Sequence, residues 1–349
     1  MGSIRELLTN HSINASAPCR IDSGGTWDIK TLALPFEQIQ PITLNFALDI
    51  RTTVSLLPFE DNRINILSHG FTQKEEFHKD RVSFKPPFGL FFAAIMFFNF
   101  HGLEIRIRSK APVKASLGGS STALVALIKA LAIVSELQGE KKLSKKEILH
   151  ISYYLEDGIS GGNCGLQDAA AAVYGGCHKW IWRYSQQNSI FKRTSLLDKT
   201  GEMNLSRRLL VAYSGKSHVS ADVNKRWLND FLSNKTRSGW IKANQIVHKL
   251  AQSIENQNWQ ETIKFLKEEM AIRREITPEA LIPITHKLIY QAEKSGCGAR
   301  FAGAGAGGSL WAIGELDKIS ALKKIWDRLL KPIPDAQILE CNIDHIGAK

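Results

Sequence analysis

A glycine and hydroxyl cluster that opens a long apolar segment constrains this chain more than any other feature. The stretch from Pro112 to Leu131 reads PVKASLGGSSTALVALIKAL. The adjacent glycines Gly118 and Gly119 let the backbone approach a ligand closely, and the free amides and dipole at a helix start favour an anion. The sequence therefore predicts a phosphate-binding loop, with hydroxyls from Ser120, Ser121 and Thr122. A simple N-terminal helix cap is the alternative that this stretch alone leaves open.

Length and charge narrow the class of protein. A chain of 349 residues favours two domains, and 44% hydrophobic with 23% charged residues is typical of globular rather than disordered or fibrous proteins. The net charge of +11 favours acidic ligands. The basic residues are spread over many segments without a nucleic-acid-binding motif, so we expect an anionic small molecule and no nucleic acid.

Cysteine usage and hydropathy predict a cytoplasmic protein without a membrane partner. The five cysteines are an odd number without metal-ligand spacing, which favours reduced thiols. The first residues lack the apolar core of a secretory signal, and the most apolar run, residues 88–100, is too short to span a bilayer. The oligomeric state is not readable, and a homodimer is one option.

A second glycine-marked segment precedes the first by about ninety residues. Arg20, Asp22 and Asp28 bracket Gly24 and Gly25. Carboxylates accept hydrogen bonds from hydroxyls and a glycine turn admits a sugar closely, so this segment is suited to a polyol, although a surface turn with an Arg and Asp pair is equally consistent.

Two later segments add to the pattern. Asp168 begins a small-residue helix after several glycines and is either a catalytic acid or an acid favoured by the helix dipole. Residues 303–308 contain four glycines before an apolar strand. Two distant glycine loops can enclose a triphosphate from opposite sides, whereas Ser214–Ser217 lacks the upstream glycine of a Walker loop and is predicted to be a turn.

Periodicity predicts an α+β protein with a boundary near residue 200. A capping box at Ser144 and Glu147 marks the start of one helix. The predicted strands are 43–57, 63–68, 103–108, 178–184, 208–213 and 337–343, and the predicted helices are 86–100, 145–156, 221–232, 241–254, 259–276, 278–294 and 317–330. We therefore predict domains 1–200 and 201–349.

Three separated motifs together resemble those of the GHMP kinases. They are residues 20–28, residues 112–121 and the late loop 303–308. Their order and spacing agree over nearly the whole chain, and one departure is Ser116, where a glycine is usual. The resemblance implies an N-terminal domain like the second domain of ribosomal protein S5, a ferredoxin-like C-terminal domain, and ATP between them.

The resemblance also implies roles for particular residues. Asp168 matches the catalytic aspartate and Arg20 an arginine that stabilises charge on the transferred phosphoryl group. Ser121 and Glu156 match the Mg²⁺ ligands, with Asp157 as the alternative to Glu156. The implied ATP-binding residues are Pro112, Ser116, Leu117, Gly118, Gly119, Ser120, Ser121, Thr122, Gly303, Gly305, Gly307 and Gly308. The implied substrate-binding residues are Arg20, Asp22, Gly24, Gly25, Asp28, Gln167, Asp168 and Gly215.

Within this family the motifs look most like those of L-fucokinase and D-glycero-D-manno-heptose 7-phosphate kinase. The implied activity is ATP-dependent phosphorylation of a sugar or sugar phosphate at its C1 hydroxyl. A kinase for a non-sugar alcohol such as an isoprenoid acid, and a non-catalytic sugar sensor, are the two alternatives.

Overall fold

The computed structural model describes residues 3–69, 74–186, 189–217 and 220–349 and contains two β-sheets. The larger sheet has the order β4-β3-β5-β2-β6-β7, with β1 paired to β2, and the smaller has the order β11-β8-β10-β9. The strands are β1 Ile13–Ser23, β2 Ile42–Pro58, β3 Arg63–His69, β4 Lys74–His78, β5 Leu103–Ser109, β6 Cys177–Trp182, β7 Phe191–Ser195, β8 Leu209–Tyr213, β9 Gly298–Phe301, β10 Ser309–Ile313 and β11 Gln337–Leu339.

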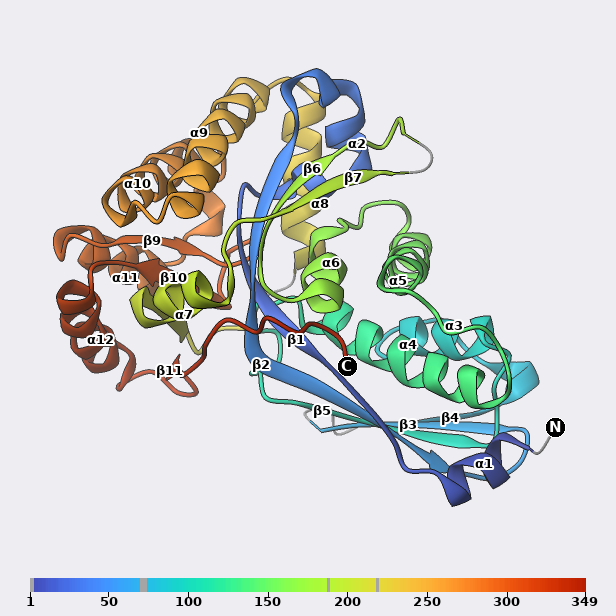
Figure 1. The fold of residues 1–349 in the computed structure, drawn as a ribbon. Coiled ribbons are helices and arrows are strands. Elements are labelled where there is room, and N and C mark those ends of the chain that lie inside the picture. The colour runs from blue at the N-terminus through green and yellow to red at the C-terminus, as the bar shows by residue number, and fades with distance from the viewer. Residues whose placement is uncertain (1–2, 70–73, 187–188, 218–219) are drawn as a thin grey trace.

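Helices α3 to α6 lie on one side of the larger sheet, and α9 to α12 gather around the smaller one (Figure 1). The helices are α1 Ile4–Asn10, α2 Lys30–Ala33, α3 Gly89–Phe97, α4 Gly119–Leu137, α5 Lys145–Ser160, α6 Gln167–Tyr174, α7 Lys199–Arg208, α8 Ser220–Leu232, α9 Arg237–Glu255, α10 Trp259–Ile276, α11 Pro283–Lys294 and α12 Leu316–Leu330.

The two long strands β1 and β2 organise the larger sheet. The first part of β2 pairs with β6 and the second part with β5, while β1 runs antiparallel to β2 along its length. The register shifts between Pro18 and Cys19, which is a bulge that bends β1 just before Arg20. This bend and the burial of the following residues place the first glycine-marked segment inside the molecule.

The smaller sheet is antiparallel, and its elements follow one another as strand, helices, two strands, helix and strand. This is the βαββαβ connectivity of a ferredoxin-like domain. The predicted α+β fold is therefore confirmed. The division at residue 200 stays a prediction, and the structure places that residue inside α7.

An apolar interface joins the two sheets beneath the glycine-rich segments. Phe46 of β2 and Trp311 of β10 pack edge to face with ring centroids 5.6 Å apart, and both side chains are buried. One buried cluster contains Ile21 and Phe46 from the larger sheet and Val211 and Trp311 from the smaller. Because the interface is closely packed, it fixes the motifs of one sheet relative to those of the other.

Helix α4 is the one helix among the described residues that is long and apolar enough to cross a membrane. Two-thirds of its apolar window is buried inside the protein, where it packs against β1 and β2. Its hydropathy is that of a central core helix, which holds the phosphate-binding loop at its N-terminus against the sheet.

Candidate active site

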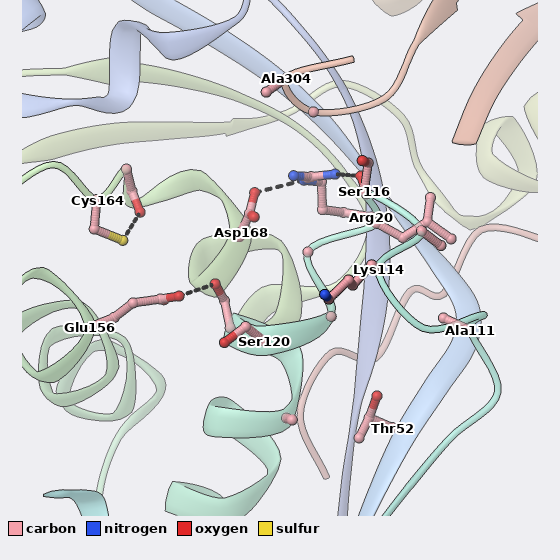
Figure 2. A pocket seen from close by; sticks show the side chains of 18 of the residues that line it. Arg20, Thr52, Ala111, Lys114, Ser116, Ser120, Glu156, Cys164, Asp168 and Ala304 are labelled. Carbon is pink, nitrogen blue, oxygen red and sulfur yellow. Dashed lines mark hydrogen bonds and ion pairs between the residues drawn. The ribbon is translucent and has the colours of Figure 1, made fainter. Parts of the chain in front are cut away.

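A cavity of about 440 Å³ lies where α4 begins. Its walls include the end of β1 and the turn after it, the loop 111–119, the turn between α5 and α6, and the late glycine loop at Gly303 and Ala304 (Figure 2). Residues of β2, β3, α3, β5, α4 and α8 complete the walls. Segments separated by almost three hundred residues therefore meet around one space.

The loop before α4 has the geometry of an anion-binding site. Gly118 is the N-cap residue in the left-handed region, at φ +72°, and no side chain caps the helix. A Cβ on Gly119 would meet nothing within 4 Å, so this glycine faces open space. The first amides of α4 are thus left for a ligand, which supports the phosphate-binding prediction over the simple side-chain cap.

The loop also explains why glycine is favoured at the position of Ser116. Ser116 has φ +59°, a left-handed conformation that is unfavourable for a residue with a Cβ. Its carbonyl accepts from Arg20, and a Cβ on Gly308 would collide with its hydroxyl. Ser309 N donates to Ala115 O at 2.8 Å, so the early and late glycine-rich loops are in direct contact.

Arg20 and Asp168 form an ion pair in the cavity wall. Arg20 Nε donates to Asp168 Oδ1 at 2.7 Å, and Arg20 Nη1 donates to the Ser116 carbonyl at 2.7 Å (Figure 2). The Arg20 side chain is 5% exposed and that of Asp168 is 24% exposed. Asp168 therefore reaches the cavity while the guanidinium is held against the phosphate-binding loop. Burial lowers the pKa of Arg20, but Asp168 and Asp22 outweigh this and raise it.

Asp22 lies behind Arg20 and outside the cavity wall. It accepts from Gly303 N at 2.6 Å and lies 3.3 Å from Arg300 Nη1 and 3.7 Å from Arg20 Nη1. Burial would raise the pKa of this carboxyl, but Arg300 and Arg20 hold it below its usual value. Its contacts fit a positioning role that links Arg20 to the late glycine loop.

Asp28 is buried at the edge of the cavity, where its Oδ2 accepts from Gln167 N at 3.0 Å. A Cβ on Gly165 would collide with this carboxylate, so the glycine is needed for the contact. Burial raises the pKa of Asp28 to about 7, and the charge of Asp168 adds to the shift. Asp28 is consequently close to half-protonated at neutral pH.

Asp28→Asn is expected to raise the melting temperature at pH 8 by a few degrees and to raise it clearly less at pH 5. The folded protein keeps a proton on Asp28 that the unfolded chain releases above its ordinary pKa near 3.8. The free energy of unfolding therefore falls as the pH rises towards 7, and the whole of this loss is present above pH 7. Thermal unfolding at both pH values tests this, with the exposed Asp61→Asn as control. An equal shift at the two pH values would contradict the assignment.

Ser121 and Glu156 meet across the cavity from Asp168. Ser121 Oγ donates to Glu156 Oε1 at 2.9 Å, and both residues line the cavity. Glu156 Oε2 is buried and has no hydrogen-bond partner among the described residues. Burial raises the pKa of Glu156 to about 7. The described residues contain no group of three or more His, Cys, Asp or Glu that could hold a metal unaided. A hydroxyl and one carboxylate next to an anion site fit Mg²⁺, which takes few protein ligands and fills its shell with phosphate oxygens and water.

The opposite end of the cavity is apolar. Pro87, Phe91, Ile107 and Val113 line it, together with the polar Thr52, Ser68 and Ser109. An apolar slot with a few hydrogen-bonding groups beside an anion site has the character of a pocket for a purine base.

The structure brings most of the predicted site residues together. The predicted residues that line the cavity are Arg20, Gly25, Asp28, Pro112, Ser116, Leu117, Gly118, Gly119, Ser120, Ser121, Glu156, Gln167, Asp168 and Gly303. Those outside its walls are Asp22, Gly24, Thr122, Asp157, Gly215, Gly305, Gly307 and Gly308. The roles of both sets of residues stay predictions, and the surroundings of the second set favour support of the loops over direct contact with a ligand.

The residues outside the walls hold the loops in place. Gly308 N donates to Lys216 O at 2.7 Å and Ser214 N donates to Gly308 O at 2.9 Å, so the turn around Gly215 supports the late glycine loop. Thr122 Oγ1 donates to the Pro18 carbonyl at 3.3 Å and secures α4 to β1. Asp157 Oδ1 accepts from Cys164 N at 3.3 Å and shapes the turn between α5 and α6.

Sequence reasoning missed several lining residues. Thr26, Asn163, Cys164 and Asn224 line the cavity, as do the apolar residues of its far end. The glycine-rich turn between residues 158 and 165 was a usable signal for Asn163 and Cys164, because such turns border ligand sites. Asn224 lies on an ordinary amphipathic helix and carried no such signal.

Comparison with known proteins agrees with this geometry. Residues 89–176 match the family described as GHMP kinases N terminal domain. Mevalonate kinase from Pyrococcus abyssi is 26% identical over 76% of this chain and 80% of that protein. The structure of Lactococcus lactis galactokinase complexed with galactose is similar with a TM-score of 0.75 and 16% identity, over 98% of this chain and 95% of that one. A D-glycero-D-manno-heptose 1-phosphate kinase from Bacteroides thetaiotaomicron has a TM-score of 0.64 and 16% identity, over 96% and 97%.

Residues 89–176 are thus a GHMP kinase N-terminal domain, and the chain as a whole has the two-domain fold of these kinases. The resemblance drawn from the three motifs is confirmed at this level. Because the similar proteins include both sugar and mevalonate kinases, the family does not by itself define the acceptor.

Proposed function

We propose that the protein is an ATP-dependent kinase that phosphorylates a hydroxyl of a sugar or sugar phosphate, at the anomeric C1 position. The observation that carries this proposal is the Arg20–Asp168 pair, which lies in one cavity between the uncapped start of α4 and the late glycine loop. Such an arrangement places a proton acceptor and a cation beside a site for phosphates, which is what phosphoryl transfer requires.

The cavity has a place for each reactant. The apolar end fits the adenine of ATP, and the amides of Gly118 and Gly119 fit its phosphates. Ser121 and Glu156 would hold Mg²⁺, which when bound neutralises phosphate charge. The acceptor then lies near Asp28, Gln167 and Asp168.

The chain's own residues would perform the transfer as follows. Asp168 accepts the proton of the acceptor hydroxyl as its oxygen attacks the γ-phosphorus. The bond between the γ-phosphorus and the bridging oxygen breaks, and ADP leaves with the electron pair. Arg20, fixed by the Ser116 carbonyl, stabilises the negative charge on the transferred group.

The polar side chains near Asp168 favour a polyol as acceptor. Gln167 Oε1 is buried with no hydrogen-bond partner within the described ranges, and the oxygens of Asp28 and Asp168 are further acceptors. Several hydroxyl donors of one sugar would satisfy them. An isoprenoid acid offers fewer donors, although the similarity to the mevalonate kinase of Pyrococcus abyssi keeps a non-sugar alcohol as the second candidate.

A substrate panel tests the proposal. ADP release is measured with Mg²⁺, ATP and each of a series of aldoses, aldose phosphates and mevalonate. We expect turnover with an aldose or its phosphate, and phosphorus NMR of the product to show an anomeric phosphate. Turnover with mevalonate alone would favour the second candidate, whereas sugar binding without ADP release would indicate a sensor.

Ser121→Ala is expected to raise the Mg²⁺ concentration required for half-maximal activity about tenfold, while the melting temperature changes little. The variant removes one oxygen ligand and leaves Glu156 in place. Activity is measured against Mg²⁺ at saturating ATP, with Ser120→Ala as the matched control. An unchanged Mg²⁺ requirement would remove Ser121 from the metal site.

A further inference from the structure

One buried cation next to the cavity, Arg273, forms no ion pair within the described residues, although the charges of Glu269, Asp22 and Glu279 act on it from a longer distance. Arg273 of α10 is fully buried, and its guanidinium carbon lies over the indole rings of Trp227 and Trp240, 4.4 and 4.2 Å from their centroids. Its Nε donates to Thr277 Oγ1 at 3.2 Å. Neither Nη1 nor Nη2 has a hydrogen-bond partner in the part of the chain that the structure describes.

Stacking on two indoles offsets only part of the cost of burying this charge, because cation–π contacts leave the N–H donors unsatisfied. Burial lowers the pKa of Arg273 to about 9, and the nearby Arg300 adds to the shift, so the guanidinium is still charged at neutral pH. An anion that accepted hydrogen bonds from the free N–H groups would stabilise this buried cation.

The neighbouring arginines are already engaged. Arg300 lies 3.3 Å from Asp22 and 3.8 Å from Glu269. Arg20 is held by Asp168 and the Ser116 carbonyl. Of these three arginines, Arg273 is therefore the one without an ion pair in the described part of the chain.

Arg273 lies directly behind the wall of the cavity. Gly25 lines the cavity, and a Cβ on it would lie 2.5 Å from Arg273 Nη1 and 2.6 Å from the Trp240 ring. Thr26 and Asn224 also line the cavity, and Thr26 Oγ1, which can donate, is buried without a partner among the described residues. A hydroxyl and an amide can both donate to an anion, and the glycine keeps the wall thin at this point.

We propose that the acceptor substrate carries an anionic group, a phosphate or a carboxylate, away from the hydroxyl that is phosphorylated, and that Arg273 with Thr26 and Asn224 binds this group. The inference rests on the proposed function and narrows its substrate class to charged sugars. Asp28, Gln167 and Asp168 would bind the hydroxyls, and the Gly25 end would bind the charge.

Matched ligand sets test the inference on the whole protein. Each set contains a neutral aldose, its terminal phosphate and its terminal carboxylate. Binding is measured by calorimetry with Mg²⁺ and a non-hydrolysable ATP analogue present, so that the phosphate-binding loop is occupied. Tryptophan fluorescence is followed in parallel, because an anion at Arg273 changes the surroundings of the Trp227 and Trp240 indoles.

We expect one anionic member to bind about 10- to 100-fold more tightly than its neutral counterpart, the scale of a charge-assisted hydrogen bond. The tighter of the phosphate and the carboxylate identifies the group. Arg273→Met should abolish this preference. Arg274→Met is the matched control, because Arg274 is the next residue, is 31% exposed and pairs with Glu293 at 2.8 Å. If Arg273→Met does not fold, Arg273→Lys should still weaken the preference severalfold.

Equal or tighter binding of the neutral members, or no binding of any anionic member, would overturn the inference. So would a preference that survives Arg273→Met or is unchanged in Arg273→Lys. These outcomes are separate from failure of the proposed function: ADP release with a neutral aldose alone contradicts only the anionic group, whereas binding of a charged sugar without ADP release contradicts only the kinase.

Discussion

Asp168→Asn is expected to lower the rate of sugar phosphorylation by about 10²- to 10⁴-fold, the range of general-base contributions, while ATP and sugar still bind. Asparagine keeps an oxygen that can accept from Arg20 Nε, so the 2.7 Å contact can be retained. It cannot accept the proton of the acceptor hydroxyl. The loss should therefore appear in kcat rather than in the dissociation constants.

Single-turnover rates and calorimetric titrations with ATP and sugar measure the two effects separately. Asp157→Asn is the matched control, because this acid lies near the cavity but outside its wall. Activity of Asp168→Asn within about threefold of the parent, far less than the expected loss, would show that Asp168 serves the helix start of α6 instead of the reaction.

Arg20→Lys is expected to lower kcat by about 10²- to 10³-fold, the scale for losing one preorganised donor to charge in the transition state. Arg20 uses two nitrogens at once, Nε for Asp168 and Nη1 for the Ser116 carbonyl. The single ammonium group of lysine cannot reproduce this planar arrangement, so both the aspartate and the phosphate-binding loop lose their fixed position.

Steady-state kinetics of Arg20→Lys should show a larger change in kcat than in KM for ATP. Arg51→Lys provides the control: Arg51 is also largely buried and ion-paired, with Asp344, but it does not line the cavity. Arg51→Lys should lower the melting temperature and leave kcat nearly unchanged. Equal kcat values for Arg20→Lys and the parent would exclude charge stabilisation by Arg20.

The sequence predicted helices well where a single local signal, such as a capping box or helical periodicity, determines their bounds. The capping box at Ser144 and Glu147 is present at the start of α5, and the predicted helix 259–276 has the bounds of α10. The predicted end of α5 at Glu156 was wrong, because the helix continues through Gly158 to Ser160. A glycine inside a helix costs only about 1 kcal/mol, which the packing of the helix can offset.

Elements held by tertiary contacts were missed. The polar segment 185–200 was predicted without a strand, yet β7 forms there because it pairs with β6 along its length. The predicted strand at 337–343 ends at Leu339. Edge pairing of this kind depends on a partner strand, so alternation in a single segment does not determine it.

The residues of the candidate active site were also predicted only in part from the sequence. Glycine loops and isolated acids identified the segments that meet at the cavity, because these residue types have few other uses at a strand-to-helix turn. Sequence alone did not separate Asp168, which reaches the cavity, from Asp22, which lies behind it. Arg273 carried no signal, since one arginine on an amphipathic helix is usually a surface residue and only packing shows that it is buried.

The last residues of the chain return to the strands of the larger sheet. Ser16 and Lys349 exchange two backbone hydrogen bonds, Asp344 pairs with Arg51, and Leu48 bridges to Ile343. Figure 1 shows the C-terminal segment passing over β1 and β2. A ribosome still holding this segment in its exit tunnel would leave β1 and β2 without these contacts, even though both strands were synthesised hundreds of residues earlier. The contacts of residues 343–349 with β1 and β2 can therefore form only after this late segment has emerged.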